Sequence, residues 1–336
     1  MIGYYVHHHG SGHLHRALSV ARAAARQGRE VTGLSSLPRP AGWPGAWILL
    51  PRDDDQERAL RPTAHGRLHW APLGDDGLRE RSAVVASWIA AARPACVVVD
   101  VSMEMVLLVR LHGVPVVSVV LPGSRGDEAH RYALGVADAL VAVWPAEATG
   151  MLRDVPEDVL ARLHPVGALS RFPLDPPGVR RPGPPHVLVL NGTGGDGPGE
   201  DQLELARRDS PEWRWTVLSR QHGTWTDDPR EHLRQADVVV THAGQNALAE
   251  VAALRRPAIV VPQRRPHEEQ RTTARALACG GWPVLVEEHW PSGGWSARLA
   301  RAATLDGRDW SRWCDGGATE RFLAVVADVA HEPVPA

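Results

Sequence analysis

The chain has 336 residues and a formal net charge of −2, and all 37 of its basic residues are arginine because no lysine occurs. Hydrophobic residues make up 43% of the sequence and charged residues 23%, which is ordinary for a globular protein and argues against a disordered chain. The near-neutral charge argues against general nucleic-acid binding, which favours a basic excess. At roughly 150 residues per domain, the length favours two domains.

The cysteines and the N-terminus indicate a cytoplasmic protein. Three cysteines, Cys96, Cys279 and Cys314, are odd in number and lack metal-ligand spacing, so neither a disulfide framework nor a zinc site is predicted. The N-terminus has no positive region of the kind that opens a signal peptide. No apolar run approaches the ~20 residues that a membrane-spanning helix needs.

Strands and helices alternate through the N-terminal half. The turn Gly10-Ser11-Gly12 leads from the first expected strand into the first expected helix. The run at residues 96–101 is apolar almost throughout, which is typical of a strand buried on both faces. We expect strands at residues 2–6, 30–35, 47–50, 96–101, 116–120 and 139–143, and helices at 13–27, 77–92, 103–111 and 126–137.

The alternation pauses at the proline-rich residues 165–185, which we interpret as an interdomain linker. It then resumes with expected strands at 186–190, 215–218, 237–241, 258–261 and 283–286, and helices at 199–208, 229–235, 246–254, 267–279 and 316–330. The prediction is an α/β fold of two Rossmann-like, doubly wound β/α domains, residues 1–164 and 186–336, facing a cleft. The helix expected at 316–330 either stays with the second domain or packs back on the first.

Residues 236–262 form a strand, a turn, a helix and a second strand. The first strand passes through Gly244 into the helix, which places unpaired N–H groups and the positive end of the helix dipole at the carboxyl edge of the sheet. Such an edge binds anions, and phosphate is the usual one. Glu250 lies within the first two helical turns, where a carboxylate can accept hydrogen bonds from ribose hydroxyls. This unit therefore predicts a nucleotide site.

Three short stretches resemble one family. The first stretch, residues 242–280, contains His242-Ala243-Gly244, Glu250, Pro257, Pro262, His267, Glu269-Gln270 and Gly280. They are similar to the C-terminal signature of GT-B glycosyltransferases, in particular the bacterial lipid-linked muramyl-peptide N-acetylglucosaminyltransferase and the UDP-glycosyltransferase group. Gly10-Ser11-Gly12-His13 resembles the loop that opens those proteins, and residues 191–195 resemble their second glycine-rich loop. Glu269 stands where many relatives have aspartate, which leaves the donor sugar open.

His13 is the candidate catalytic base. It follows a glycine-rich turn at a helix N-terminus, where the positive end of the dipole favours the neutral imidazole that can accept a proton from an acceptor hydroxyl. Asp100 ends a buried strand, so its carboxylate should lie at the same sheet edge and orient the imidazole. The alternatives are that His13 only positions the loop and that Asp100 only caps the helix that follows it.

The remaining candidates hold the donor. The resemblance implies that Gly12, His242, Gly244, Gln245 and Asn246 surround the diphosphate, with Thr193 and Gly194 on the facing loop. Glu250 is expected to bind the ribose, and Glu269 and Gln270 the sugar hydroxyls. The alternative for these three side chains is solvent exposure on helix surfaces. No metal and no cofactor are predicted, since the sugar nucleotide is a cosubstrate and Asp53-Asp54-Asp55 and Asp75-Asp76 have the character of solvated loops.

We therefore expect a glycosyltransferase that transfers a sugar from a nucleotide-diphosphate sugar, with UDP the expected nucleotide, to an unidentified hydroxyl with inversion. The acceptor is a small molecule or is lipid-linked, and contact with a membrane surface stays open. One alternative is a nucleotide-sugar hydrolase of the same fold, and a sugar-nucleotide 2-epimerase is a less favoured one. The non-enzymatic alternative is an auxiliary protein that only binds a nucleotide or a partner enzyme.

Overall fold

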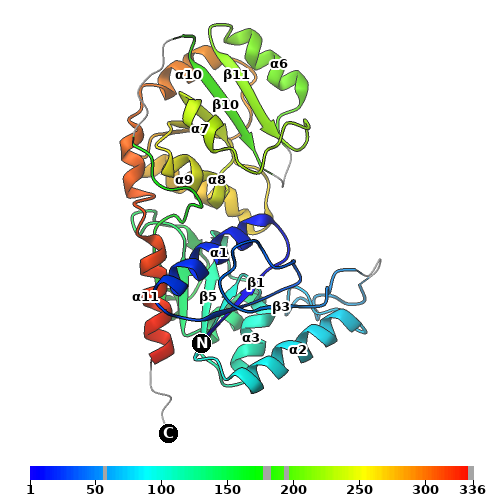
Figure 1. Cartoon of the computed structure of the whole chain (residues 1–336). Coiled ribbons are helices and arrows are strands. Elements are labelled where there is room, and N and C mark those ends of the chain that lie inside the picture. Colours follow the sequence, from blue (N-terminus) through cyan, green and yellow to red (C-terminus); the bar gives the residue numbers. More distant parts are fainter. Residues whose placement is uncertain (56–58, 177–182, 193–196, 332–336) are drawn as a thin grey trace.

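Two parallel β-sheets, each in its own lobe, organise the chain (Figure 1). The computed structural model describes residues 1–55, 59–176, 183–192 and 197–331. Strands follow one another in the order β3-β2-β1-β4-β5-β7-β9 in the first lobe and β11-β10-β12-β13-β14 in the second. The strand order reverses between β1 and β4 and between β10 and β12, and ligands of doubly wound sheets bind at such points. The predicted fold is confirmed.

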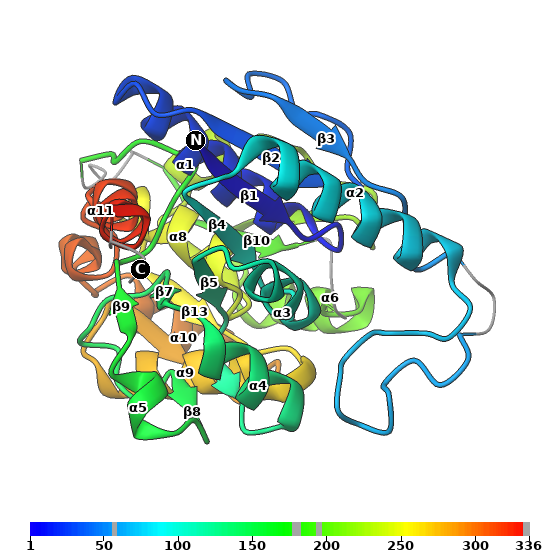
Figure 2. The same cartoon turned by 90° about the horizontal axis from the view of Figure 1, so that it is seen from below.

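The first sheet consists of β1 (Ile2–Val6), β2 (Val31–Ser35), β3 (Trp47–Leu49), β4 (Cys96–Asp100), β5 (Val116–Val120), β7 (Ala139–Ala142) and β9 (Leu163–Pro165). Its helices are α1 (Ser11–Arg26), α2 (Asp76–Ala92), α3 (Met103–Leu111), α4 (Glu128–Val136) and the short α5 (Glu157–Leu160). A separate two-stranded sheet pairs β6 (Gly123–Ser124) with β8 (Leu152–Arg153). Seen from below, α2 and α3 lie on one face of the large sheet and α1 lies on the other (Figure 2).

The second lobe contains β10 (His186–Asn191), β11 (Arg214–Ser219), β12 (Val238–Thr241), β13 (Ala258–Val260) and β14 (Val284–Val286). Its helices are α6 (Glu200–Asp209), α7 (Arg230–Gln235), α8 (Gln245–Ala253), α9 (Glu269–Cys279) and α10 (Trp295–Ala302). Two 3₁₀ helices, η1 (Pro266–Glu268) and η2 (Gly307–Arg312), and the last helix, α11 (Ala318–His331), complete the described elements.

The expected elements occur within two residues of their predicted bounds, and the helix expected at 267–279 begins two residues late. His267 and Glu268 both have φ of 56°, in the left-handed region, which an α-helix cannot continue through. The helix therefore begins at Glu269. The sequence reading also missed β6, β8, β9, α5 and α10, which are short or lack a clear period.

The last helix leaves the second lobe and packs on the first. Figure 1 shows α11 beside α1, and Phe322 at its centre is fully buried. The Phe322 ring stacks on Tyr4 of β1 with 6.4 Å between ring centroids. One hydrophobic cluster therefore joins the two ends of the chain, with Tyr4, Ala17, Val20 and Val326 among its members.

The chain passes between the lobes twice, and the two crossings lie side by side. The first follows β9 and the second follows η2. The Ala168 N–H of the first crossing donates to the Trp313 carbonyl of the second over 2.8 Å. Arg321 of α11 donates to the Val166 carbonyl over 2.7 Å. Backbone and side-chain hydrogen bonds thus hold the two crossings together.

Away from the crossings, the lobes meet where β6 lies against η1. A Cβ atom at Gly123, where φ is 121°, would lie 2.2 Å from the carbonyl oxygen of His267. Only glycine permits so close an approach at that φ. Arg153 of β8 forms an ion pair with Glu268 of η1 beside this contact.

Candidate functional site

His13 and Asp100 meet at the carboxyl edge of the first sheet. β1 pairs with β4 in parallel, and their register places Val6 beside Asp100. The chain leaves β1, turns at Gly10 with φ of 88°, and enters α1, whose first turn carries His13. Nδ1 of His13 lies 2.9 Å from Oδ1 of Asp100. Because a carboxylate only accepts, the bond to Asp100 needs the proton on Nδ1, which leaves Nε2 to accept one. Arg16 Nη2 also lies 3.1 Å from Nδ1, but it donates to the same Asp100 oxygen.

Arg16 completes the buried network beneath His13. Its Nε and Nη2 donate to the two oxygens of Asp100, each over 2.9 Å. Burial alone would raise the pKa of Asp100, but Arg16 and His13 outweigh that effect and hold the pKa well below its usual range. Asp100 is therefore an anion that stabilises positive charge on His13.

The N-terminus of α8 faces His13 from the other lobe. Gly244 is its N-cap, and the next N–H groups have no intrahelical partner. Arg16 Nη1 donates to Gln245 Oε1 over 3.4 Å, while Gln245 Nε2 is buried and has no hydrogen-bond partner within the described ranges. A Cβ atom at Gly12 would lie 1.9 Å from Asn246 Nδ2, so glycine leaves room for the Asn246 amide in its present position. The arrangement presents several donors to an anion.

Two predicted donor-site residues hold the loops around α8. The Gly244 N–H donates to His242 Nδ1 over 3.0 Å. Gln270 is 2% exposed, and its Oε1 accepts from the Ala243 and Gln263 N–H groups. Gln270 is therefore not exposed at the start of its helix, and its amide oxygen already accepts hydrogen bonds from two backbone N–H groups. Contact of Gln270 with a sugar stays a prediction, which now rests on its Nε2.

Glu250 and Glu269 are removed from bulk solvent. Glu250 of α8 is 7% exposed and accepts from Arg171 Nε over 2.7 Å. Burial raises the pKa of Glu250, and Arg171 opposes that rise. Burial likewise raises the pKa of Glu269, with Arg125 and Arg265 acting in the opposite direction. Neither carboxylate is a solvated surface group.

A cleft of about 730 Å³ between the lobes unites these side chains, and this volume is within the usual range for ligand sites. Within the described part of the chain, every predicted site residue except the buried Asp100 lines it. Thr193 and Gly194 lie outside the described residues. Arg171, Arg220, Trp225 and Arg265 also line the cleft and were not predicted. Arg16, three residues after His13, was predictable from helical spacing, whereas Arg171 lies in the proline-rich stretch without a periodic signal.

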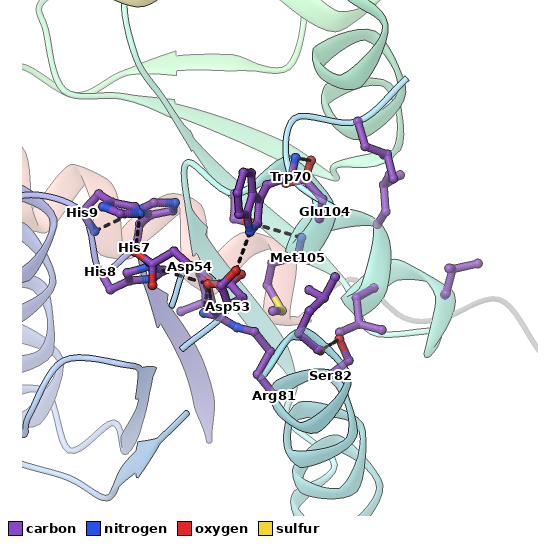
Figure 3. A pocket seen from close by; sticks show the side chains of 17 residues that line it. His7, His8, His9, Asp53, Asp54, Trp70, Arg81, Ser82, Glu104 and Met105 are labelled. Carbon is purple, nitrogen blue, oxygen red and sulfur yellow. Dashed lines mark hydrogen bonds and ion pairs between the residues drawn. The ribbon is translucent and has the colours of Figure 1, made fainter. Parts of the chain in front are cut away.

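A second cavity of about 820 Å³ opens in the first lobe (Figure 3). Its walls are largely apolar and include Trp70, Met105 and Leu108. Figure 3 shows His7, His8 and His9 gathered at one side of it. Burial lowers the pKa of His7 to about 3, with nearby histidines acting in the same direction, so His7 is neutral at pH 7. His9 lines both this cavity and the cleft that His13 lines.

The expectation of solvated aspartates is wrong for Asp53 and Asp54. Asp53 forms an ion pair with Arg81 of α2, which is 1% exposed, and His8 Nε2 lies 3.3 Å from Asp54 Oδ2. Both aspartates line the second cavity. Asp75 is the N-cap of α2 and accepts from the Leu78 N–H. Sequence reasoning missed the roles of Asp53 and Asp54 because their partners are distant in the chain, whereas Asp75 caps its own helix.

Of the first-lobe tryptophans Trp43, Trp47, Trp70 and Trp88, one lines the second cavity. Trp70 does so, and its Nε1 donates to the Asp53 carbonyl over 2.8 Å. Trp43 and Trp47 instead pack edge to face with 4.8 Å between ring centroids. Trp88 lies against Gly3 of β1. The last three have structural packing roles.

Two Rossmann-like lobes with a shared cleft at their sheet edges define the GT-B fold of glycosyltransferases. The glycosyltransferase family 28 C-terminal domain matches residues 209–288, which include α8 and η1. An uncharacterized glycosyltransferase of Methanopyrus kandleri is 33% identical over 108 residues, covering 31% of this chain and 30% of that protein. The resemblance predicted from the sequence is confirmed, and these matches support a glycosyltransferase.

Solved structures agree over almost the whole chain. MurG of Acinetobacter baumannii superposes with a TM-score of 0.61 at 14% identity, covering 97% of this chain and 99% of that one. Phytolacca americana UGT2, in complex with UDP-2-fluoroglucose and pterostilbene, gives 0.66 at 17% identity, covering 98% and 99%. At such identities the likeness establishes the fold. None of the helices in the described ranges is long and apolar enough to cross a membrane.

Proposed function

We propose that the chain transfers a sugar from a uridine-diphosphate sugar to a hydroxyl group of an apolar acceptor, with inversion at the anomeric carbon and without a catalytic metal. The observation that carries the proposal is the contact of His13 with Asp100 directly opposite the N-terminus of α8. A base and an anion-binding helix end thus face each other across one cleft. UDP is proposed because family 28 and the UDP-bound P. americana enzyme share this architecture.

The reaction needs one proton acceptor and one site for negative charge. The acceptor hydroxyl gives its proton to Nε2 of His13 while its oxygen bonds to C1 of the sugar. The bond between C1 and the phosphate oxygen breaks, and its electrons leave with the nucleotide diphosphate. N–H groups of α8 and the Gln245 amide stabilise that charge, in the place that a metal occupies in other transferases. Asp100 stabilises the imidazolium.

The cavity in the first lobe supports transfer rather than hydrolysis. Water needs no binding space, whereas this cavity has about 820 Å³ and apolar walls. His9, four residues before His13, lines both this cavity and the donor cleft. A flat or elongated apolar alcohol fits that description, and Trp70 offers an aromatic surface against it.

The experiment incubates the protein with a panel of sugar nucleotides, with and without apolar alcohols and phenols. It measures the rate at which the nucleotide diphosphate is released. We expect release that depends on acceptor, needs no added metal ion, and yields a product whose anomeric coupling constant shows inversion. Release at the same rate without acceptor would establish the hydrolase instead. Folded protein that binds no sugar nucleotide would refute both.

The His13→Ala variant tests the assigned base. We expect kcat to fall on the order of 10²- to 10⁴-fold, because the acceptor loses its proton acceptor, while the Kd for the nucleotide diphosphate stays within about twofold. The matched control is His112→Ala, which removes an exposed histidine whose ring bonds to the Leu108 carbonyl of its own helix. Wild-type kcat in His13→Ala would refute the role.

A further inference from the structure

Three histidines surround one aspartate where the lobes meet at η1. Asp127 is the N-cap of α4 and His130 lies in the first turn of that helix. His69 comes from the loop before α2, and His267 comes from η1 of the other lobe. The ligand atoms of all four residues lie within 4.8 Å of one another. None of the four lines the donor cleft or the cavity of the first lobe.

Distances in this cluster match those between the ligands of one small cation. His69 Nε2 lies 2.9 Å from Asp127 Oδ1, and His267 Nδ1 lies 3.6 Å from Asp127 Oδ2. A tetrahedral zinc ion with bonds of about 2.0–2.1 Å separates neighbouring ligand atoms by about 3.3 Å. Only small shifts would therefore bring these two imidazoles and the carboxylate to a common ion.

His130 has a different part in the cluster. Arg125 Nη1 lies 3.3 Å from His130 Nε2, and an arginine can only donate. A neutral His130 therefore accepts at Nε2 and carries its proton on Nδ1, which lies 2.5 Å from Asp127 Oδ2. A metal ion on Nδ1 would move that proton to Nε2, where it would face the Arg125 donor. His130 instead orients the carboxylate, as the outer partners of metal ligands do.

We propose that His69, Asp127 and His267 bind a divalent transition metal ion, best matched by Zn²⁺, and that this ion joins the two lobes. Two neutral imidazoles and one carboxylate are a ligand set that zinc accepts. Asp127 and His267 line an open cavity of about 610 Å³, which gives an ion a path to the site and leaves a coordination position for water.

The ion would act on the donor cleft through η1. His267 lies two residues before Glu269, a candidate for contact with the sugar, and follows Arg265 and Pro266, which line the cleft. A bond from His267 to an ion held by the first lobe would keep η1 against β6, where Gly123 already permits close approach. The site is therefore structural and distinct from the reaction, and it does not depend on the proposed function.

The test measures Zn²⁺ binding to the whole chain after metal has been removed from it. Calorimetry and the zinc content after dialysis report the binding, and Co²⁺ serves as a spectroscopic probe. We expect one tightly bound equivalent. The variants His69→Ala and His267→Asn should each weaken binding more than about 100-fold, since loss of an outer partner alone costs about 10- to 100-fold. Asparagine is chosen because it tolerates the φ of 56° at position 267.

Three further variants sharpen the test. His130→Ala should weaken binding less than the ligand variants, and Asp127→Asn should abolish it while the amide oxygen still caps α4. His9→Ala removes a member of a second cluster, His8, His9 and Asp54, and should leave the affinity unchanged. Wild-type protein that binds no Zn²⁺ at micromolar concentration overturns the proposal. So does wild-type affinity in His69→Ala and His267→Asn, or loss of the bound equivalent in His9→Ala.

Discussion

Asp100 shows how a single buried charge organises a site. The carboxylate is fully buried, yet it has three hydrogen-bonding neighbours, His13, Arg16 and Tyr4. Val101, the next residue, has φ of 64°, a conformation that costs a β-branched residue on the order of 1–3 kcal/mol. The fold accepts this strain directly after the strand that delivers Asp100, a pattern typical of functional positions.

His242 should make the protein less stable in mild acid. Burial, and secondarily Arg265, lowers the pKa of His242 to about 4 from a model-peptide value of about 6.5. Between these two pH values the unfolded chain binds a proton that the folded chain does not, so the free energy of unfolding falls as pH decreases from about 6.5 to about 4. Above pH 6.5 both states are neutral and this contribution does not change with pH.

The His242→Asn variant isolates that effect, because its amide oxygen can still accept from the Gly244 N–H. We expect urea unfolding at a series of pH values to show a shallower decline below pH 6.5 than in the wild type. The same variant of the exposed His112 should keep the wild-type slope. An unchanged slope in His242→Asn would contradict the assignment.

At single positions, the sequence predicted residues that follow strand ends and missed those brought in by distant segments. His13 and Asp100 were predictable as neighbours, because parallel strands end at one edge. The Glu250 carboxylate was predicted to lie in the site, but its partner Arg171 was not, since a proline-rich stretch has no period that fixes its direction. The buried position of Gln270 was also missed, because its partners are backbone N–H groups in other loops.

At the level of elements, the place that Asn246 of α8 takes against α1 depends on the absence of a side chain at Gly12. In the Gly12→Ala variant the new methyl group would displace Asn246, which must move because the Cβ would lie 1.9 Å from its Nδ2. Overpacking of this kind costs about 1–3 kcal/mol. If donor binding bears that cost, its KM rises roughly 5- to 150-fold.

The control for this variant is Gly135→Ala, which adds a methyl group within α4 where no atom lies within 4 Å. It should leave the KM for the donor unchanged and stabilise the helix by about 0.5–1 kcal/mol. The double variant Gly12→Ala/Asn246→Ala should lose the steric part of the effect. A wild-type donor KM in Gly12→Ala would show that Asn246 moves aside at no cost to donor binding.

Element prediction succeeded where periodicity was strong and failed where the backbone is decided by tertiary contacts. α3 has its predicted bounds because its apolar residues repeat at helical spacing and Ser102 caps it. In contrast, β6 and β8 have two residues each and exist only because they pair with each other. The left-handed residues of η1 follow from its position against β6, which no local pattern encodes.

At the scale of the whole molecule, α11 is part of the core of the first lobe. Phe322→Ala should lower the free energy of unfolding by about 3–5 kcal/mol, because Phe322 is fully buried against Tyr4. Denaturant unfolding measures the change, and Leu205→Ala on the surface of α6 should cost less than about 0.5 kcal/mol. A Phe322→Ala protein as stable as the wild type would mean that α11 is dispensable. The helix itself was predictable, whereas its partner was left as an option.

The paired crossings restrict how the cleft can open. Two bodies joined at a single point can rotate about any axis, whereas two connections bonded to each other through Ala168 and Trp313 behave as one short joint. The joint lies beside α11, whereas η1 meets β6 in another part of the interface. The joint therefore offers least resistance to a motion that separates η1 from β6. Opening would therefore be a rotation of one lobe as a rigid unit, with the mouth of the cleft moving farthest and the two chain crossings almost still.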